Sequence, residues 1–167
     1  MPKYPAADIY IYKSGVFDLA GIHSTIRSWC FKHKFVPFQT VFKDKPGDPQ
    51  GRQIIDDWKA KRKVTGYIVY WMGVEIKGWD ITDVEVGAKK AKRQKGRIRV
   101  RVISEYETDW EKRFGASPFL EKMRKFYENY IIKKDLQTKY EAELFGLTYD
   151  LHGALKKLLE VEAEKIG

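Results

Sequence analysis

Residues that build disulfides and metal centres are scarce in this chain, which has one cysteine and three histidines in 167 residues. A lone Cys30 excludes an internal disulfide, and a protein without disulfides is typical of a reducing, cytoplasmic location. His23 and Cys30 are seven residues apart and would share a helix face, but two ligands do not make a zinc site. We therefore expect no metal and no other cofactor.

Long hydrophobic runs and nucleotide-binding motifs are also missing. No run of about 18 apolar residues is present, so no membrane-spanning helix is expected. The first 15 residues lack a basic segment followed by an apolar one, so we expect no secretory signal. The motifs GxGxxG, Walker A and GxSxG do not occur, which leaves dinucleotide, NTP and serine-hydrolase chemistry without support. Asparagine occurs once, at Asn129, and this bias is typical of proteins from hot environments.

Positive charge is what the sequence has in excess. The net charge is +9, and residues 89–101, KKAKRQKGRIRVR, contain eight basic side chains and no acid. We call residues 89–101 the basic segment; its cations are Lys89, Lys90, Lys92, Arg93, Lys95, Arg97, Arg99 and Arg101. Such a run repels itself, and a bound polyanion would relieve the repulsion.

The charge is unevenly distributed along a chain that is expected to form one domain. Residues 1–117 contain 23 basic and 14 acidic side chains, whereas residues 118–167 contain nine of each. No repeat, linker or low-complexity tract divides the two parts. We therefore expect the functional surface in residues 1–117, and the neutral C-terminal part would allow homo-oligomerisation without repulsion between copies.

Hydrophobic periodicity predicts an α+β protein. Apolar residues at steps of three and four predict a helix over residues 16–34, and Ser117-Pro118 is typical of a helix start. A helix, or two abutting ones, should follow to Gly146, and a last helix should begin near Thr148. Strands are predicted over residues 9–12, 35–43, 52–61, 63–77, 78–86 and 96–104.

The order of these elements favours a curved, mostly antiparallel sheet of about six strands, with an early helix and C-terminal helices packed on one face. A ββαβ-type or barrel-like closure remains an alternative. Residues 63–77 give the strongest strand pattern and should be central. We expect their Met72 face to pack against a helix stripe formed by Leu120, Met123 and Tyr130.

The basic segment is predicted to be a loop that joins two strands of a hairpin. If Val84 faces Ile98, the apolar faces match, and Asp83 and Glu85 then fall opposite Arg99 and Arg97. In this register the arginines are partly structural. The tip, from Lys89 to Lys95, has no acidic neighbour in the sequence and should be exposed.

A second basic group precedes the central strand and consists of Lys59, Lys61, Arg62 and Lys63. The two groups together would form one patch for phosphates. The leading hypothesis is a non-enzymatic, cytoplasmic protein that binds structured RNA, on the ribosome for example, through a basic hairpin finger. No RNP, KH or zinc-knuckle signature supports specific base recognition.

Two alternatives belong to other functional classes. In a helix-grip ligand-binding domain, Trp58, Trp71, Met72 and Tyr130 would line an apolar pocket. In a metal-dependent nuclease, acids would converge on Mg²⁺. The candidate acids form three groups in the sequence: Asp80, Asp83 and Glu85; Glu105, Glu107 and Asp109; and Asp56 with Asp57.

Two runs carry a resemblance to other proteins. GRQIIDDWKAKRKVTGYIVYWMGVEI (residues 51–76) and DWEKRFGASPFLEKMRKFYENYI (residues 109–131) resemble a family of uncharacterised archaeal proteins of similar length. The resemblance covers most of the chain. It implies an archaeal source and no particular activity.

Overall fold

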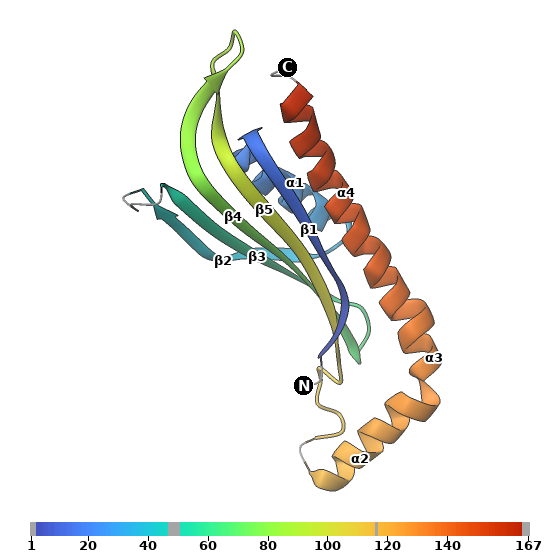
Figure 1. Ribbon diagram of the computed structural model, residues 1–167. Coiled ribbons are helices and arrows are strands. Elements are labelled where there is room, and N and C mark those ends of the chain that lie inside the picture. The colour runs from blue at the N-terminus through green and yellow to red at the C-terminus, as the bar shows by residue number, and fades with distance from the viewer. Residues whose placement is uncertain (1–2, 47–50, 116, 165–167) are drawn as a thin grey trace.

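A computed structural model describes residues 3–46, 51–115 and 117–164 (Figure 1). The strands are β1 (Lys3–Phe17), β2 (Val36–Lys45), β3 (Gln53–Lys63), β4 (Ile68–Val86) and β5 (Ala91–Thr108). Helix α1 (Leu19–Lys32) follows β1. After β5 come α2 (Pro118–Phe126), a π-helical turn η1 (Tyr127–Ile131), α3 (Lys133–Asp135), a second π-helical turn η2 (Leu136–Glu141) and the long α4 (Ala142–Glu164).

The five strands form one antiparallel sheet in the order β1-β5-β4-β3-β2. This arrangement confirms the predicted α+β class, with an early helix and C-terminal helices. The two strands expected over residues 63–77 and 78–86 are one strand, β4, which is interrupted only by a bulge after Trp79. There Asp80 adopts a positive φ of 55°. A Cβ atom at Gly96 would lie 2.7 Å from the Trp79 carbonyl oxygen, so the bulge requires glycine on β5.

One face of the sheet, the inner face, forms the hydrophobic core. Alternate residues of β4 point to it, and Ile68, Met72 and Ile76 are almost fully buried. Helices α1 and α4 cover this face (Figure 1), and α4 buries Leu144, Leu151, Leu155 and Leu159 against it. The spacing of these leucines, mostly four residues, places them on one stripe of the helix.

The predicted helix partner of the sheet was wrong. Met123 is 44% exposed and Tyr130 is 77% exposed, so their stripe does not cover Met72. They belong to residues 118–141, which we call the helical arm and which lies beyond one end of the sheet (Figure 1). The predicted start is confirmed, because the Ser117 side chain accepts a hydrogen bond from the Leu120 backbone N–H at 3.2 Å. The expected helix end at Gly146 is absent, and α4 runs through it.

Candidate nucleic-acid interface

The opposite face of the sheet, the outer face, has no described helix over it (Figure 1). It presents the strand residues that alternate with the buried ones. Its basic side chains come from all five strands: Lys3, Lys43, Lys45, Lys59, Lys61, Lys63, Lys77, Lys95, Arg97, Arg99 and Arg101. Its acids are fewer: Asp8, Asp57, Glu75, Glu105 and Glu107. The outer face is therefore the basic face of the sheet.

The basic segment is folded differently from the prediction. It is mostly strand, because β4 and β5 continue to a tight turn over residues 87–90, in which Gly87 and Lys90 have positive φ angles. Val84 faces Arg93, and Ile98 faces Gly78, so the predicted pairing of Val84 with Ile98 was wrong. The partner of Ile98 differs from the prediction by six residues, an even number that keeps the β5 side chains on their faces. The partner of Val84 differs by five, because the bulge after Trp79 adds one residue to β4, and Val84 therefore shares the face of Arg93. Hydrophobic alternation did not reveal the bulge, and the bulge and the turn together set the register.

The new register gives the arginines other partners than expected. Arg97 binds Asp80 at 2.8 Å, and Asp83 binds Arg52 at 2.9 Å. The predicted pairs of Asp83 with Arg99 and of Glu85 with Arg97 are therefore wrong. Arg99 has no carboxylate within ion-pair distance in the described part of the chain.

Two neighbouring arginines on β5 differ in how fully they are paired. Arg101 bridges Asp8 at 2.6 Å and Glu75 at 3.2 Å. The hydrogen bonds from Arg101 lower the pKa of the Asp8 carboxyl and hold both groups charged. Arg99, in contrast, lies with its guanidinium carbon 5.7 Å from the centre of the Tyr10 ring, and its buried Nε atom has no acceptor among the described residues. Arg99 is therefore the arginine among these two that has no carboxylate partner in the described residues.

Four lysines at the end of the hairpin are exposed and form no ion pair with any described residue: Lys89, Lys90, Lys92 and Lys95. The fifth cation of the predicted tip, Arg93, is different. It is half-buried and lies 3.8 Å from Asp18, so the expectation that the whole tip lacks acidic partners was wrong at this position. We call residues 87–95 the finger. Its last two residues pair with β1, and the turn projects beyond the rest of the sheet (Figure 1).

The second basic group divides between the two faces. Lys59, Lys61 and Lys63 point to the outer face, whereas the Arg62 guanidinium lies 3.7 Å from Glu143 of α4. Lys61 faces Trp71, about 16 residues along β4 from the finger turn, or roughly 50 Å at 3.3 Å per residue. The two groups therefore lie near opposite ends of one face, and the arginines of β5 lie between them.

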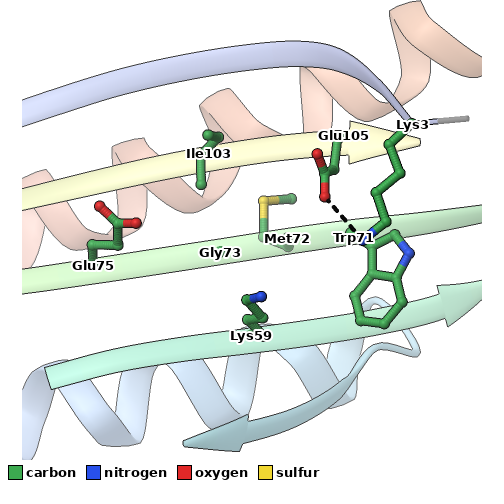
Figure 2. A pocket seen from close by; sticks show the side chains of 8 residues that line it. All are labelled: Lys3, Lys59, Trp71, Met72, Gly73, Glu75, Ile103 and Glu105. Carbon is green, nitrogen blue, oxygen red and sulfur yellow. Dashed lines mark ion pairs between the residues drawn. The ribbon is translucent and has the colours of Figure 1, made fainter. Parts of the chain in front are cut away.

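A hollow of about 210 Å³ lies on the outer face beside the second group (Figure 2). Gly73 provides no side chain there, and a Cβ atom would lie 2.9 Å from the Ile103 Cγ2 atom. Trp71 borders the hollow, but Lys3 and Lys61 lie 4.7 and 5.3 Å from its ring centre. Lys3 also pairs with Glu105 at 3.4 Å, the dashed line in Figure 2. The Trp71 ring is therefore already in contact with two lysines, and its Nε1–H donates a hydrogen bond to Glu107 at 2.9 Å.

The four residues expected to line an apolar interior pocket do not meet. Trp58 and Met72 are buried on the inner face, where the gap that they border is only about 10 Å³. A gap of that size is at the lower limit for one water molecule. Trp71 lies on the outer face, and Tyr130 is exposed on the helical arm.

Several of the candidate acids are bound to other groups, but the buried Asp57 Oδ1 atom has no hydrogen-bond partner among the described residues. In residues 3–46, 51–115 and 117–164 no three Asp, Glu, His or Cys side chains form a cluster able to hold a metal ion. The fully buried Asp56 contacts His23 and accepts a hydrogen bond from Gln39 at 2.6 Å. Burial alone would raise the pKa of Asp56, but these bonds outweigh burial and lower it. His23, unremarkable in the sequence, thus helps to fix α1 to β3.

Exposed aromatic side chains of the outer face are what the sequence analysis missed. Tyr10 and Tyr12 alternate with Ile9 and Ile11, whose side chains point toward the helices. Tyr12 is 71% exposed. The alternation in residues 9–12 was the available signal, because it assigns the tyrosines to the opposite face from the isoleucines.

Comparisons with known proteins add no family. No family model matches the chain, and no curated protein matches it. One solved structure that it resembles is the crystal structure of the di-domain ARO/CYC StfQ from the steffimycin biosynthetic pathway, with 9% sequence identity and a TM-score of 0.25. The match covers 94% of this chain and 52% of that one, so the chain spans about half its length. This likeness is too low to support a shared activity. No helix in the described part of the chain is long and apolar enough to cross a membrane.

Proposed function

We propose that the protein binds RNA without catalysis, through the finger and the outer face of the sheet. The observation that carries the proposal is the placement of charge. Cations from five strands gather on the face that no described helix covers, and four finger lysines that form no ion pair with a described residue extend the surface. Lysines of this kind bind phosphates rather than bases, so they hold a nucleic acid without reading its sequence.

Folded RNA suits this shape better than a flat substrate would. A narrow hairpin can reach phosphates inside grooves and junctions, while the sheet behind it offers a broad basic surface. Ribosomal RNA is one folded RNA of this kind, and the proposed location is the cytoplasm, in keeping with the single buried thiol of Cys30. The alternative of an interior ligand site draws less support, because the gap beside Trp58 and Met72 is about 10 Å³.

The salt dependence of binding tests the proposal. Wild-type protein is titrated with a fluorescein-labelled RNA stem-loop at several salt concentrations, and the slope of log K against log[salt] is measured. In the test variant the four finger lysines, Lys89, Lys90, Lys92 and Lys95, are replaced by alanine. Each lost phosphate contact should flatten the slope by about 0.7 to 0.9, so four should flatten it by about 3. Folding should hardly change, because exposed charges contribute little to stability.

The helical arm offers a control of equal charge. Its exposed lysines Lys122, Lys125, Lys133 and Lys134 are replaced by alanine in a second variant. This variant should keep the wild-type slope, because the arm lies away from the outer face. Equal flattening in both variants would show diffuse attraction instead of a finger contact. Absence of any RNA binding by the wild type at low salt would refute the proposed function.

A further inference from the structure

A second hollow, of about 370 Å³, lies on the outer face toward the finger end of the sheet. Tyr12, Ser14, Trp79 and Arg97 line it, together with the cross-strand pair Lys13 and Ile98. Its volume lies within the range of roughly 300 to 1,000 Å³ that is usual for small-molecule sites. Unlike the hollow beside Trp71, it has a highly exposed aromatic ring at its border, because Tyr12 is 71% exposed.

The ring of Tyr12 is held in place although it is exposed. It stacks on Tyr10, with 5.9 Å between ring centres and 12° between ring planes. Tyr10 is in turn contacted by Arg99 and Arg101, whose guanidinium carbons lie 5.7 and 5.6 Å from its ring centre. An aromatic ring that is both fixed and exposed is suited to stacking with a planar ligand, since little side-chain entropy is lost on binding.

Cations able to contact phosphates lie near this ring. Arg99 faces Tyr12 directly across β1 and β5, and its buried Nε atom has no acceptor in the described residues. Lys95 is four residues before Arg99 on the same face, about 13 Å along the strand. Arg97, between them, is held by Asp80 at 2.8 Å and lies with its guanidinium carbon 6.0 Å from the Trp79 ring centre. A ligand that suits these side chains has a planar, uncharged group to stack on Tyr12 and anionic groups on either side of it. One nucleotide in a single strand has this chemistry.

We infer that this hollow binds one unpaired nucleobase, stacked on Tyr12 beside Trp79, with neighbouring phosphates on Arg99 and Lys95. The inference rests on the proposed function and narrows it. Bases inside a duplex present their faces only to each other, so the site requires a bulge, a loop or a single strand. The preferred ligand is thus RNA that has unpaired nucleotides next to the phosphates bound by the finger.

The test compares an oligoadenylate with a blunt RNA duplex of the same number of phosphates. Tyr12→Ala should weaken oligoadenylate binding by about 5- to 150-fold, the value expected for one lost base–aromatic stack, and should leave duplex binding unchanged. Tyr12→Phe keeps the ring and should bind like the wild type. Tyr130→Ala is the matched control, because Tyr130 is 77% exposed but lies on the helical arm, and it should change neither affinity.

Tryptophan fluorescence locates the site independently. Oligoadenylate should quench the wild-type emission, and Trp79→Phe should remove part of that quenching. Trp110→Phe should retain it, because the Trp110 indole donates to the Thr65 carbonyl oxygen at the opposite end of the sheet. Equal oligoadenylate affinity for wild type and Tyr12→Ala would overturn the inference while leaving the phosphate-binding proposal intact. Failure of the wild type to bind either probe would instead remove the proposed function, and the inference with it.

Discussion

Replacing Glu128 with alanine should weaken the attachment of the helical arm to the sheet. Glu128 lies on η1 and is 4% exposed. Its carboxylate accepts hydrogen bonds from the hydroxyls of Tyr4 and Tyr67, each at 2.8 Å, and from Arg124 at 2.9 Å. Tyr4 belongs to β1, and Tyr67 directly precedes β4. One buried carboxylate therefore joins the arm to two strands of the sheet.

The size of the effect follows from the groups left behind. In Glu128→Ala two half-buried tyrosines lose the acceptor of their hydroxyls, and Arg124 keeps its bonds to Glu121. Removing one partner from a buried charged network costs about 3–5 kcal/mol. For a chain of this length each kcal/mol lowers Tm by about 2–4 °C, so the variant should melt about 6–20 °C below the wild type.

Chemical denaturation and thermal melting measure this change. Glu128→Gln keeps an acceptor oxygen but loses the charge, so it should fall between wild type and Glu128→Ala. Asp135→Ala removes an exposed acid from the same arm and should stay within about 0.5 kcal/mol of the wild type. If Glu128→Ala melts like Asp135→Ala, the carboxylate does not hold the arm and the account of its anchoring is refuted.

Two further predictions concern the core of the sheet. Met72→Asp buries an unpaired carboxylate at a position that is 2% exposed, so it should lower the free energy of unfolding by about 4 kcal/mol or more. The control Thr82→Asp, at an exposed site on the same strand, should change the free energy of unfolding by less than about 1 kcal/mol. If Met72→Asp has the denaturation midpoint of the wild type, the assignment of the inner face is wrong. Burial, with a smaller effect of Glu141, raises the pKa of Tyr106 to about 12, so its stabilisation is complete below pH 10 and is lost as the pH rises from about 10 to about 12. Tyr106→Phe should therefore reduce the loss of stability with rising pH by up to about 1.4 kcal/mol per pH unit in that window. If the slope of unfolding free energy against pH is the same in the variant and the wild type, burial does not raise the pKa of the Tyr106 hydroxyl.

Alternation along the strands was enough to predict the fold class. Apolar residues of β4 at every second position identified the inner face, and its length and hydrophobicity identified a central strand. The helix that covers this face was not predictable in the same way. Residues 120–131 and 144–159 both carry apolar residues at helical spacing, and only the second stripe is buried against the sheet. Periodicity shows that a helix has an apolar side, but it does not show what that side contacts.

The sequence determines on which face of the sheet a charged side chain lies, but it does not determine which charged side chains pair. Lys59, Arg97 and Arg99 alternate with buried apolar residues, so they had to lie on the face opposite the core in either hairpin register. The basic face therefore survives the register error. Ion pairs depend on the register itself, because a shift by a few residues exchanges every partner along β5. For this reason the pairing of Arg97 with Asp80, and the lack of a carboxylate for Arg99 in the described residues, required the structure. Arg99, which lies opposite Tyr12, and not the total charge, therefore distinguishes this end of the sheet as the proposed ligand site.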